Sequence, residues 1–259
     1  MDILTQLADH ARERVVAAKA AVPSGEMEER ARSLVRGEGF RFEKALRGDD
    51  IAFICECKKA SPSKGLIAPD FPYVELAKEY ESAGAAAISV LTEPKWFLGS
   101  GRYLKEISDA VSIPCLRKDF TVDEYMIFEA KTLGASAVLL ICSLLDEETL
   151  RRFRETADSL ELSSLVEAHS EDEIAMALRA GARIIGVNNR NLRNFTVDVG
   201  NSVRLRRLVP RDVLFVAESG IKTAADVNAL READVNAVLV GESLMRASDK
   251  KEMLDRLRG

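Results

Sequence analysis

An acid and a base stand two residues apart at the end of a predicted strand. The apolar run Ile51–Cys55 is followed by Glu56, Cys57 and Lys58. Because successive side chains of a strand point to opposite faces, Glu56 and Lys58 share one face and Cys57 takes the other. A carboxylate and an ammonium group held together in this way are suited to proton transfer. Taken alone, the pattern favours an exposed strand end with solvated charges.

Six further predicted strands end in polar side chains. These are Thr92 and Glu93; Arg117, Lys118 and Asp119; Glu167 and His169; Asn188, Asn189 and Arg190; Glu218 and Ser219; and Glu242 and Ser243. Any one of these residues would also suit a solvated rim. If the strand ends converge, however, opposed charges in a partly dry pocket shift each other's pKa values, which favours acid–base chemistry.

The strands that carry these residues follow a repeating pattern. Four predicted helices end at a short junction, and an apolar strand begins a few residues after each. The junctions are Gly84, Gly134, Gly181 and Asp234, spaced 50, 47 and 53 residues apart. Further strand-like runs lie before and between them, at 51–56, 113–118, 163–167 and 213–217. Each quarter of the repeat therefore holds two strand–helix units.

Amphipathic segments predict eight helices between and after these strands, at 73–83, 103–110, 123–133, 147–159, 171–180, 202–208, 224–232 and 244–257. Alternating strands and helices indicate an α/β fold with a parallel sheet. The fourfold similarity favours a single closed (βα)8 barrel, the TIM barrel, over an open doubly wound sheet. No Gly-x-Gly-x-x-Gly follows the first strand, which further argues against a dinucleotide-binding fold.

Residues 1–50 contain no convincing strand. Apolar spacing predicts helices over about 1–20 and 26–36. We therefore expect an N-terminal helical extension over 1–50, packed on a barrel over 51–259, within one structural domain. Phe40 and Phe42 of this extension are expected to lean over the mouth of the barrel.

Glycines at two strand ends predict a phosphate site. Gly220 follows Ser219 after the seventh strand, and Gly241 precedes Glu242 after the eighth. A glycine lets a ligand approach the backbone closely, and the loops after strands seven and eight of this fold commonly bind phosphate. Ordinary turn glycines are the alternative.

Composition narrows the possible partners. A formal net charge of −5 makes nucleic acid an improbable main partner. Four cysteines without a Cys-x-x-Cys pair, and only two histidines, predict buried reduced thiols and no metal site. The longest apolar run, 135–145, is too short to span a bilayer, and the first residues lack a signal peptide's apolar core. We expect a cytoplasmic protein.

Seven local motifs at the strand ends resemble those of the indole-3-glycerol phosphate synthase family, over essentially the whole chain. They are ECKKASPSKGLI at 56–67, TEP at 92–94, LRKDF at 116–120, LVEAH at 165–169, GVNNRNL at 186–192, AESGI at 217–221 and VGESLM at 240–245. Asn191 stands where an aspartate is common in the family, and Asp234 replaces a glycine-type junction. Neither departure affects a residue to which the resemblance assigns a catalytic role.

The resemblance implies a lyase of tryptophan biosynthesis. The family closes the pyrrole ring of indole on 1-(2-carboxyphenylamino)-1-deoxyribulose 5-phosphate and releases CO₂ and water, with no cofactor and no metal. A phosphorylated small molecule is thus the expected partner. Association with other tryptophan-pathway enzymes cannot be read from the sequence.

The resemblance also implies roles for individual residues. Lys118 would protonate the substrate ketone, Glu167 would face the developing cation, and Glu56 and Lys58 would serve the later dehydration. The other implied catalytic residues are Asn188, which also anchors the substrate, and Ser219. Substrate-binding roles fall on Ser61, Pro62, Phe97, Phe120, Arg190 and Glu218. Phosphate-binding roles fall on Ser61, Ser219, Gly220, Gly241 and Glu242.

Two alternatives stay open at this point. Phosphoribosylanthranilate isomerase and the tryptophan synthase α-subunit are also phosphate-binding barrels, but both lack the helical extension and the Glu-x-Lys strand end. A catalytically silent phosphosugar-binding barrel would keep the glycines and would be free to replace Lys118, Glu167 or Glu56. All three residues are present.

Overall fold

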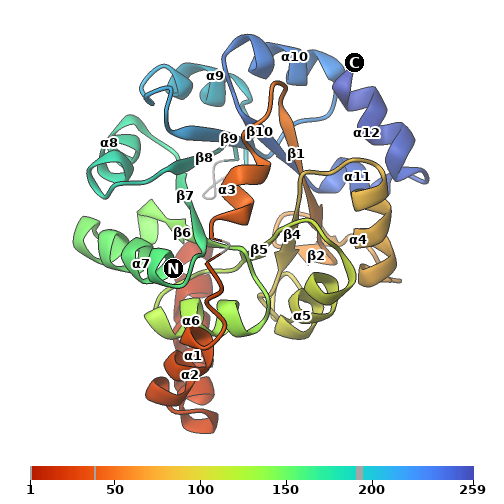
Figure 1. Cartoon of the computed structure of the whole chain (residues 1–259). Helices are drawn as coiled ribbons and strands as arrows, with labels where there is room; N and C mark the ends of the chain where they lie inside the picture. Colours follow the sequence, from red (N-terminus) through yellow and green to blue (C-terminus); the bar gives the residue numbers. More distant parts are fainter. Residues whose placement is uncertain (1, 38, 191–194) are drawn as a thin grey trace.

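The computed structural model describes residues 2–37, 39–190 and 195–259. Eight parallel strands close into a barrel in the order β1-β10-β9-β8-β7-β6-β5-β4 (Figure 1). The strands are β1 Ala52–Cys57, β4 Ala87–Leu91, β5 Cys115–Lys118, β6 Ala137–Ile141, β7 Ser163–Ala168, β8 Ile184–Asn188, β9 Leu214–Glu218 and β10 Ala237–Val240. All eight predicted strands are present, and the predicted (βα)8 barrel is confirmed.

Helices form a ring outside the strands. They are α4 Tyr73–Ser82, α5 Gly101–Ala110, α6 Glu124–Thr132, α7 Glu147–Ser159, α8 Glu171–Arg179, α9 Gly200–Arg206, α10 Ala224–Glu232, α11 Glu242–Arg246 and α12 Lys250–Arg258, with a 3₁₀ turn η1 at Cys142–Leu144. Serine, aspartate or threonine side chains cap α5, α6, α7, α8 and α10 by accepting a backbone N–H of the first turn. These caps fix where each loop at the strand ends gives way to a helix.

The strand alternation divides the core into two parts. Phe53 and Cys55 pack outward against the helices, whereas Ile54 points into the barrel. Inside, Ile54 joins Leu116, Leu165 and other buried side chains. Because alternate residues of a strand point the same way, Glu56 of β1 points into the barrel as Ile54 does.

The four repeat junctions share one backbone conformation. Gly84, Gly134 and Gly181 have φ values of 83°, 82° and 80°, and Asp234 has φ 62°. A left-handed residue ends each preceding helix and turns the chain into the next strand. Asp234 therefore performs the glycine's function at the fourth junction, with the small strain that a Cβ adds there.

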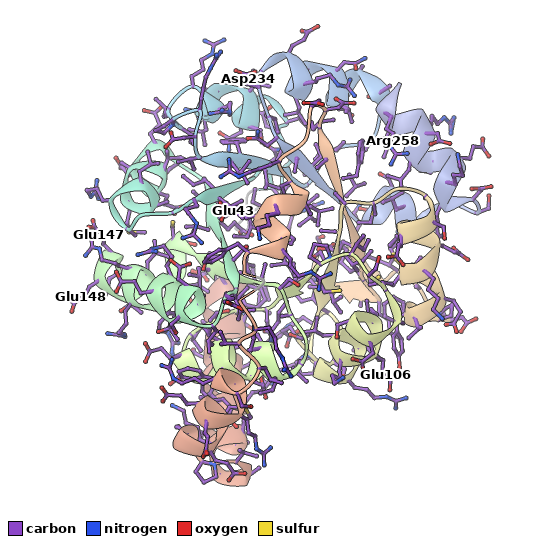
Figure 2. All side chains as sticks on the ribbon, in the orientation of Figure 1. Glu43, Glu106, Glu147, Glu148, Asp234 and Arg258 are labelled. Atoms are coloured by element: carbon purple, nitrogen blue, oxygen red, sulfur yellow. The ribbon has the colours of Figure 1, made fainter. Side chains whose placement is uncertain are left out.

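The N-terminal helices contact both ends of the barrel. In α1 Ile3–Ala21, Ile3 and Leu7 line the cavity at the carboxyl ends of the strands, and α2 Ser24–Arg32 packs on α6. The short helix α3 Arg41–Ala45 covers the opposite end, where it lies over the barrel centre in Figure 1. The side chain of Glu43, labelled in Figure 2, comes from this helix.

The placement of α3 corrects one prediction. Phe42 is fully buried in the barrel interior, and the Phe40 N–H donates to the carbonyl of Glu161, just before β7. The guanidinium of Arg183, just before β8, lies 4.4 Å from the Phe40 ring centroid. Both phenylalanines thus pack at the amino ends of the strands and do not lean over the mouth. An apolar side chain there seals the open end of the barrel interior.

Two local elements also differ from the prediction. The single helix expected over 244–257 is two helices, α11 and α12, because Asp249 caps a new helix by accepting the N–H of Glu252. The loop after β1 contains a small antiparallel hairpin, β2 Ala60–Ser61 with β3 Gly65–Leu66. Within the described residues, no helix is long and apolar enough to cross a membrane.

Candidate active site

A cavity of about 520 Å³ opens at the carboxyl ends of the strands. All the predicted site residues line it: Glu56, Lys58, Ser61, Pro62, Phe97, Lys118, Phe120, Glu167, Asn188, Arg190, Glu218, Ser219, Gly220, Gly241 and Glu242. The barrel therefore brings together residues that are up to 186 positions apart in the chain. Asn191 and Leu192 of the GVNNRNL motif lie outside the described residues.

Lys118 lies between two buried carboxylates at the floor of the cavity. Its Nζ is 2.5 Å from Glu218 Oε2 and 3.2 Å from Glu167 Oε2. Burial would lower the pKa of Lys118, but the negative charges of Glu218, Glu167 and Glu56 outweigh it and raise that pKa above its usual range. Lys118 is therefore cationic at neutral pH and is positioned to donate a proton.

The two carboxylates differ in their proton affinity. Burial raises the pKa of Glu218 to about 7, because its effect outweighs the opposing charge of Lys118, and the negative charge of Glu167 adds a smaller increase. Burial would also raise the pKa of Glu167, but Lys118 and His169 hold it well below its usual range. Two carboxylates whose environments separate their pKa values are a common arrangement for acid–base catalysis.

A second acid–base pair lies beside this group. The Lys58 ammonium donates a hydrogen bond to Glu56 Oε1, as the strand parity predicts. A Cβ on Gly241 would lie 2.5 Å from Glu56 Oε1 and 3.0 Å from Lys58 Nζ. Gly241 thus admits this pair next to β10, which is a requirement that the sequence did not reveal. Glycine is the only residue that fits there without moving the pair.

Gly186 in β8 makes a similar opening for Glu218. A Cβ on Gly186 would lie 2.3 Å from Glu218 Oε1. This oxygen is buried and has no hydrogen-bond partner within the described chain. Within the part of the chain that the structure describes, the carboxylate is therefore held through its other oxygen, by Lys118.

Part of the cavity lining has the character of an anion site. Ser219 and Gly220 have positive φ values of 67° and 87°. The buried Ser61 Oγ lines the cavity and has no hydrogen-bond partner among residues 2–37, 39–190 and 195–259. Lys64 Nζ lies 3.4 Å from the Glu242 carboxylate, close by. A strained backbone at Ser219 and an available buried hydroxyl are features of a ligand-binding loop.

Phe97 and Phe120 give the cavity an apolar part of its lining. The rings of Phe97 and Phe120 are 6.1 Å apart between centroids. The Glu93 carboxylate accepts the backbone N–H groups of Lys95, Trp96 and Phe97, which fixes the loop that carries Phe97. Such a wall suits a flat aromatic group.

Sequence reasoning missed several residues of this cavity. Ile3 and Leu7 come from α1, and Lys64 and Arg246 line the side near Glu242. The amphipathic spacing of α1 indicated an apolar face but not what it covers. The lysine in the loop after β1 was visible in the motif ECKKASPSKGLI, where only its neighbours were assigned roles.

The closed parallel barrel and the acid–base cluster at its carboxyl mouth define an enzyme of the (βα)8 class. Residues 4–257 match the family described as Indole-3-glycerol phosphate synthase. The chain belongs to this family of decarboxylating, ring-closing lyases.

Individual relatives agree with this assignment. The indole-3-glycerol phosphate synthase of Ruminiclostridium cellulolyticum is 55% identical over 257 residues, which is 99% of each chain. That of Endomicrobium trichonymphae is 61% identical over 217 residues, 84% of each chain. The crystal structure of 3-hexulose-6-phosphate synthase from Salmonella typhimurium is similar in fold alone, with a TM-score of 0.66 and 12% identity over 80% of this chain and 96% of that chain.

Proposed function

We propose that this chain converts 1-(2-carboxyphenylamino)-1-deoxyribulose 5-phosphate to indole-3-glycerol phosphate, CO₂ and water. The observation that carries the proposal is the cationic Lys118, held between Glu167 and Glu218 at the floor of a cavity with an apolar wall and an anion-binding side. This arrangement matches a substrate with an aromatic ring at one end, a phosphate at the other and a ketone between them.

Ring closure requires a proton at the ketone oxygen. As the ring carbon that bears the carboxylate attacks the ketone carbon, Lys118 donates a proton to the oxygen, which becomes a hydroxyl group. The aromatic ring is cationic until CO₂ leaves, and Glu167 lies 3.2 Å from Lys118 to face that charge. A preorganised carboxylate stabilises such a cation without reorganising.

Loss of water then completes the indole. Dehydration needs one group to take a proton from carbon and another to protonate the departing hydroxyl. The hydrogen-bonded pair of Glu56 and Lys58 supplies a base and an acid side by side. Glu218, whose pKa is raised by burial, lies on the other side of Lys118 and can return a proton to it.

The two ends of the substrate have different binding groups. Ser61, Ser219 and Gly220 would bind the phosphate, together with the backbone at Gly241 and Glu242. Phe97, Phe120 and Pro62 would hold the anthranilate ring, and Arg190 and Asn188 would bind its carboxylate and the sugar hydroxyls. A planar guanidinium is well matched to a carboxylate.

The test is indole formation from the synthetic substrate, followed by product fluorescence. It is run in metal-free buffer with a chelator, so that the result also reports on metal dependence. Turnover supports the proposal. Tight substrate binding without turnover would refute the acid–base assignment, and absence of binding would refute the substrate.

A further inference from the structure

His169 lies directly behind the proposed active site. It follows β7 by one residue, and its Nε2 is 3.3 Å from Glu167 Oε1. This distance is that of an ion pair, although the two groups are not aligned as a hydrogen bond. Among the described residues the ring does not line the mouth cavity, and its contact with a residue of the site is with Glu167.

The other side of the ring is held by α8. His169 Nδ1 is 3.1 Å from Glu173 Oε2, and the same oxygen accepts the backbone N–H of His169 at 2.6 Å. Glu173 is in the first turn of α8, where its own N–H donates to the Ser170 cap. The helix start therefore fixes the orientation of the imidazole.

Glu167 divides its two oxygens between two sets of partners. Oε2 faces Lys118 at 3.2 Å, whereas Oε1 faces His169 at 3.3 Å and the Asn188 amide at 3.3 Å. Lys118 must release a proton during turnover and changes its charge as it does so. His169 and Asn188, the partners of Oε1, do not take part in that proton transfer and can hold the carboxylate throughout.

We propose that His169, clamped between Glu173 and Glu167, is a positioning residue that keeps the Glu167 carboxylate ionised and aimed at the reacting ring. This inference rests on the proposed function and adds a residue to its machinery. His169 would donate no proton to the substrate.

The charges around the ring support a positive imidazole. Both of its nitrogens face carboxylate oxygens, and only the imidazolium carries an N–H on each nitrogen. Burial would lower the pKa of His169, but the nearby Glu167 carboxylate and the hydrogen-bonded Glu173 carboxylate raise it to about 10. On the outer side, a cavity of about 560 Å³ has the charged groups Asp2, Arg190 and Asp198 in its lining.

A neutral residue at position 169 would raise the pKa of Glu167, because a cation next to Oε1 is lost. Glu167 would then be partly protonated in mildly acidic solution, where the wild-type group is ionised. Turnover would fall as the pH falls, whereas substrate affinity would change little. A residue that only supported the fold would give a loss that is independent of pH.

The experiment compares pH profiles of kcat and KM for the wild type, His169→Gln, Glu173→Gln and the control His10→Gln. His10 is the only other histidine in the chain, and its carboxylate partner, Glu93, accepts backbone N–H groups of the loop 95–97 and has no assigned part in proton transfer. Glutamine keeps a hydrogen-bonding group but no charge at position 169. Circular dichroism checks that each variant is folded.

For His169→Gln we expect kcat to fall about tenfold at neutral pH, with KM within about threefold. The ratio of wild-type to variant kcat should be at least about threefold larger at pH 5 than at pH 8, because protonation of Glu167 adds to the loss at low pH. Glu173→Gln should show the same trend more weakly, and His10→Gln should show none. A pH-independent deficit, or none, overturns the inference. Absence of turnover in the wild type would refute the proposed function itself.

Discussion

Replacing Lys118 with methionine tests both the chemistry and the electrostatics of the site. Methionine keeps much of the side-chain length and removes the charge that lies between Glu167 and Glu218. Loss of a general acid lowers kcat by about 10²- to 10⁴-fold. Substrate binding should stay within about tenfold, or 1.4 kcal/mol, because the phosphate and ring contacts remain.

The effect on stability follows from the distances. At an effective dielectric constant of about 20, two unit charges about 3 Å apart attract each other by about 5 kcal/mol. A carboxylate that loses this attraction takes up a proton when protonation costs less free energy than staying charged without its partner. For a glutamate of unperturbed pKa about 4.3, the cost at pH 7 is about 4 kcal/mol. We therefore expect Lys118→Met to lower the free energy of unfolding by about 4 kcal/mol at pH 7.

The sign of the pH dependence is fixed by the same reasoning. In the folded variant, a carboxylate that has lost Lys118 binds a proton at pH values where the same carboxylate of the folded wild type is ionised. The unfolded chains differ only in the lysine. The deficit in unfolding free energy should therefore narrow as the pH falls, by up to about 1.4 kcal/mol per pH unit for each proton bound. Urea unfolding followed by circular dichroism at about pH 5.5, 7 and 8 measures it.

Lys105→Met is the matched control. Lys105 pairs with Asp109 on the exposed face of α5, where a charge pair contributes little. We expect a change below about 0.5 kcal/mol at every pH and normal turnover. If Lys118→Met kept turnover within a few-fold of wild type, Lys118 would not be the acid. A deficit in stability that did not vary with pH would refute the electrostatic account.

Three further outcomes are expected. Gly186→Ala should lower kcat at least about tenfold with the fold intact, because the new methyl group displaces the Glu218 carboxylate that it would meet at 2.3 Å; unchanged kinetics would contradict this. Phe42→Ala should reduce the free energy of unfolding in urea by about 3 to 5 kcal/mol, yet leave KM within about twofold, since Phe42 is buried far from the mouth. All four cysteine thiols are buried, and burial raises the pKa of each. A thiol reagent should therefore modify none in the native protein and four after unfolding.

The sequence predicted best what depends on strand parity and strand order. Glu56 and Lys58 share a face because they are two residues apart at the carboxyl end of β1, and the barrel topology then places Lys118 and Glu167 at the same end. These are local or topological rules, which do not depend on the details of packing. The chemical roles of the residues are proposals, because strand parity and topology fix position and not chemistry.

The position of Phe42 and the contact of His169 with Glu167 depend on tertiary packing, which the sequence pattern does not predict. Nothing in the pattern around Phe42 distinguishes the two ends of the barrel, since either end offers apolar surface to a short helix. The contact of His169 with Glu167 depends on where β7 ends and how Glu173 turns the ring. The break between α11 and α12, by contrast, had a signal in the sequence: Asp249 stands three residues before Glu252, a pattern typical of a helix start.

The path of the chain has a practical consequence for joining this enzyme to another protein. Ile3 lies at the mouth, whereas Arg258 donates to the carbonyl of Gly84, just before β4, and its guanidinium lies 5.5 Å from the Phe53 ring in β1. The label of Arg258 in Figure 2 marks this end of α12. A tag or fusion partner attached after residue 259 would thus leave from the side away from substrate entry, while one attached before residue 2 would emerge beside it.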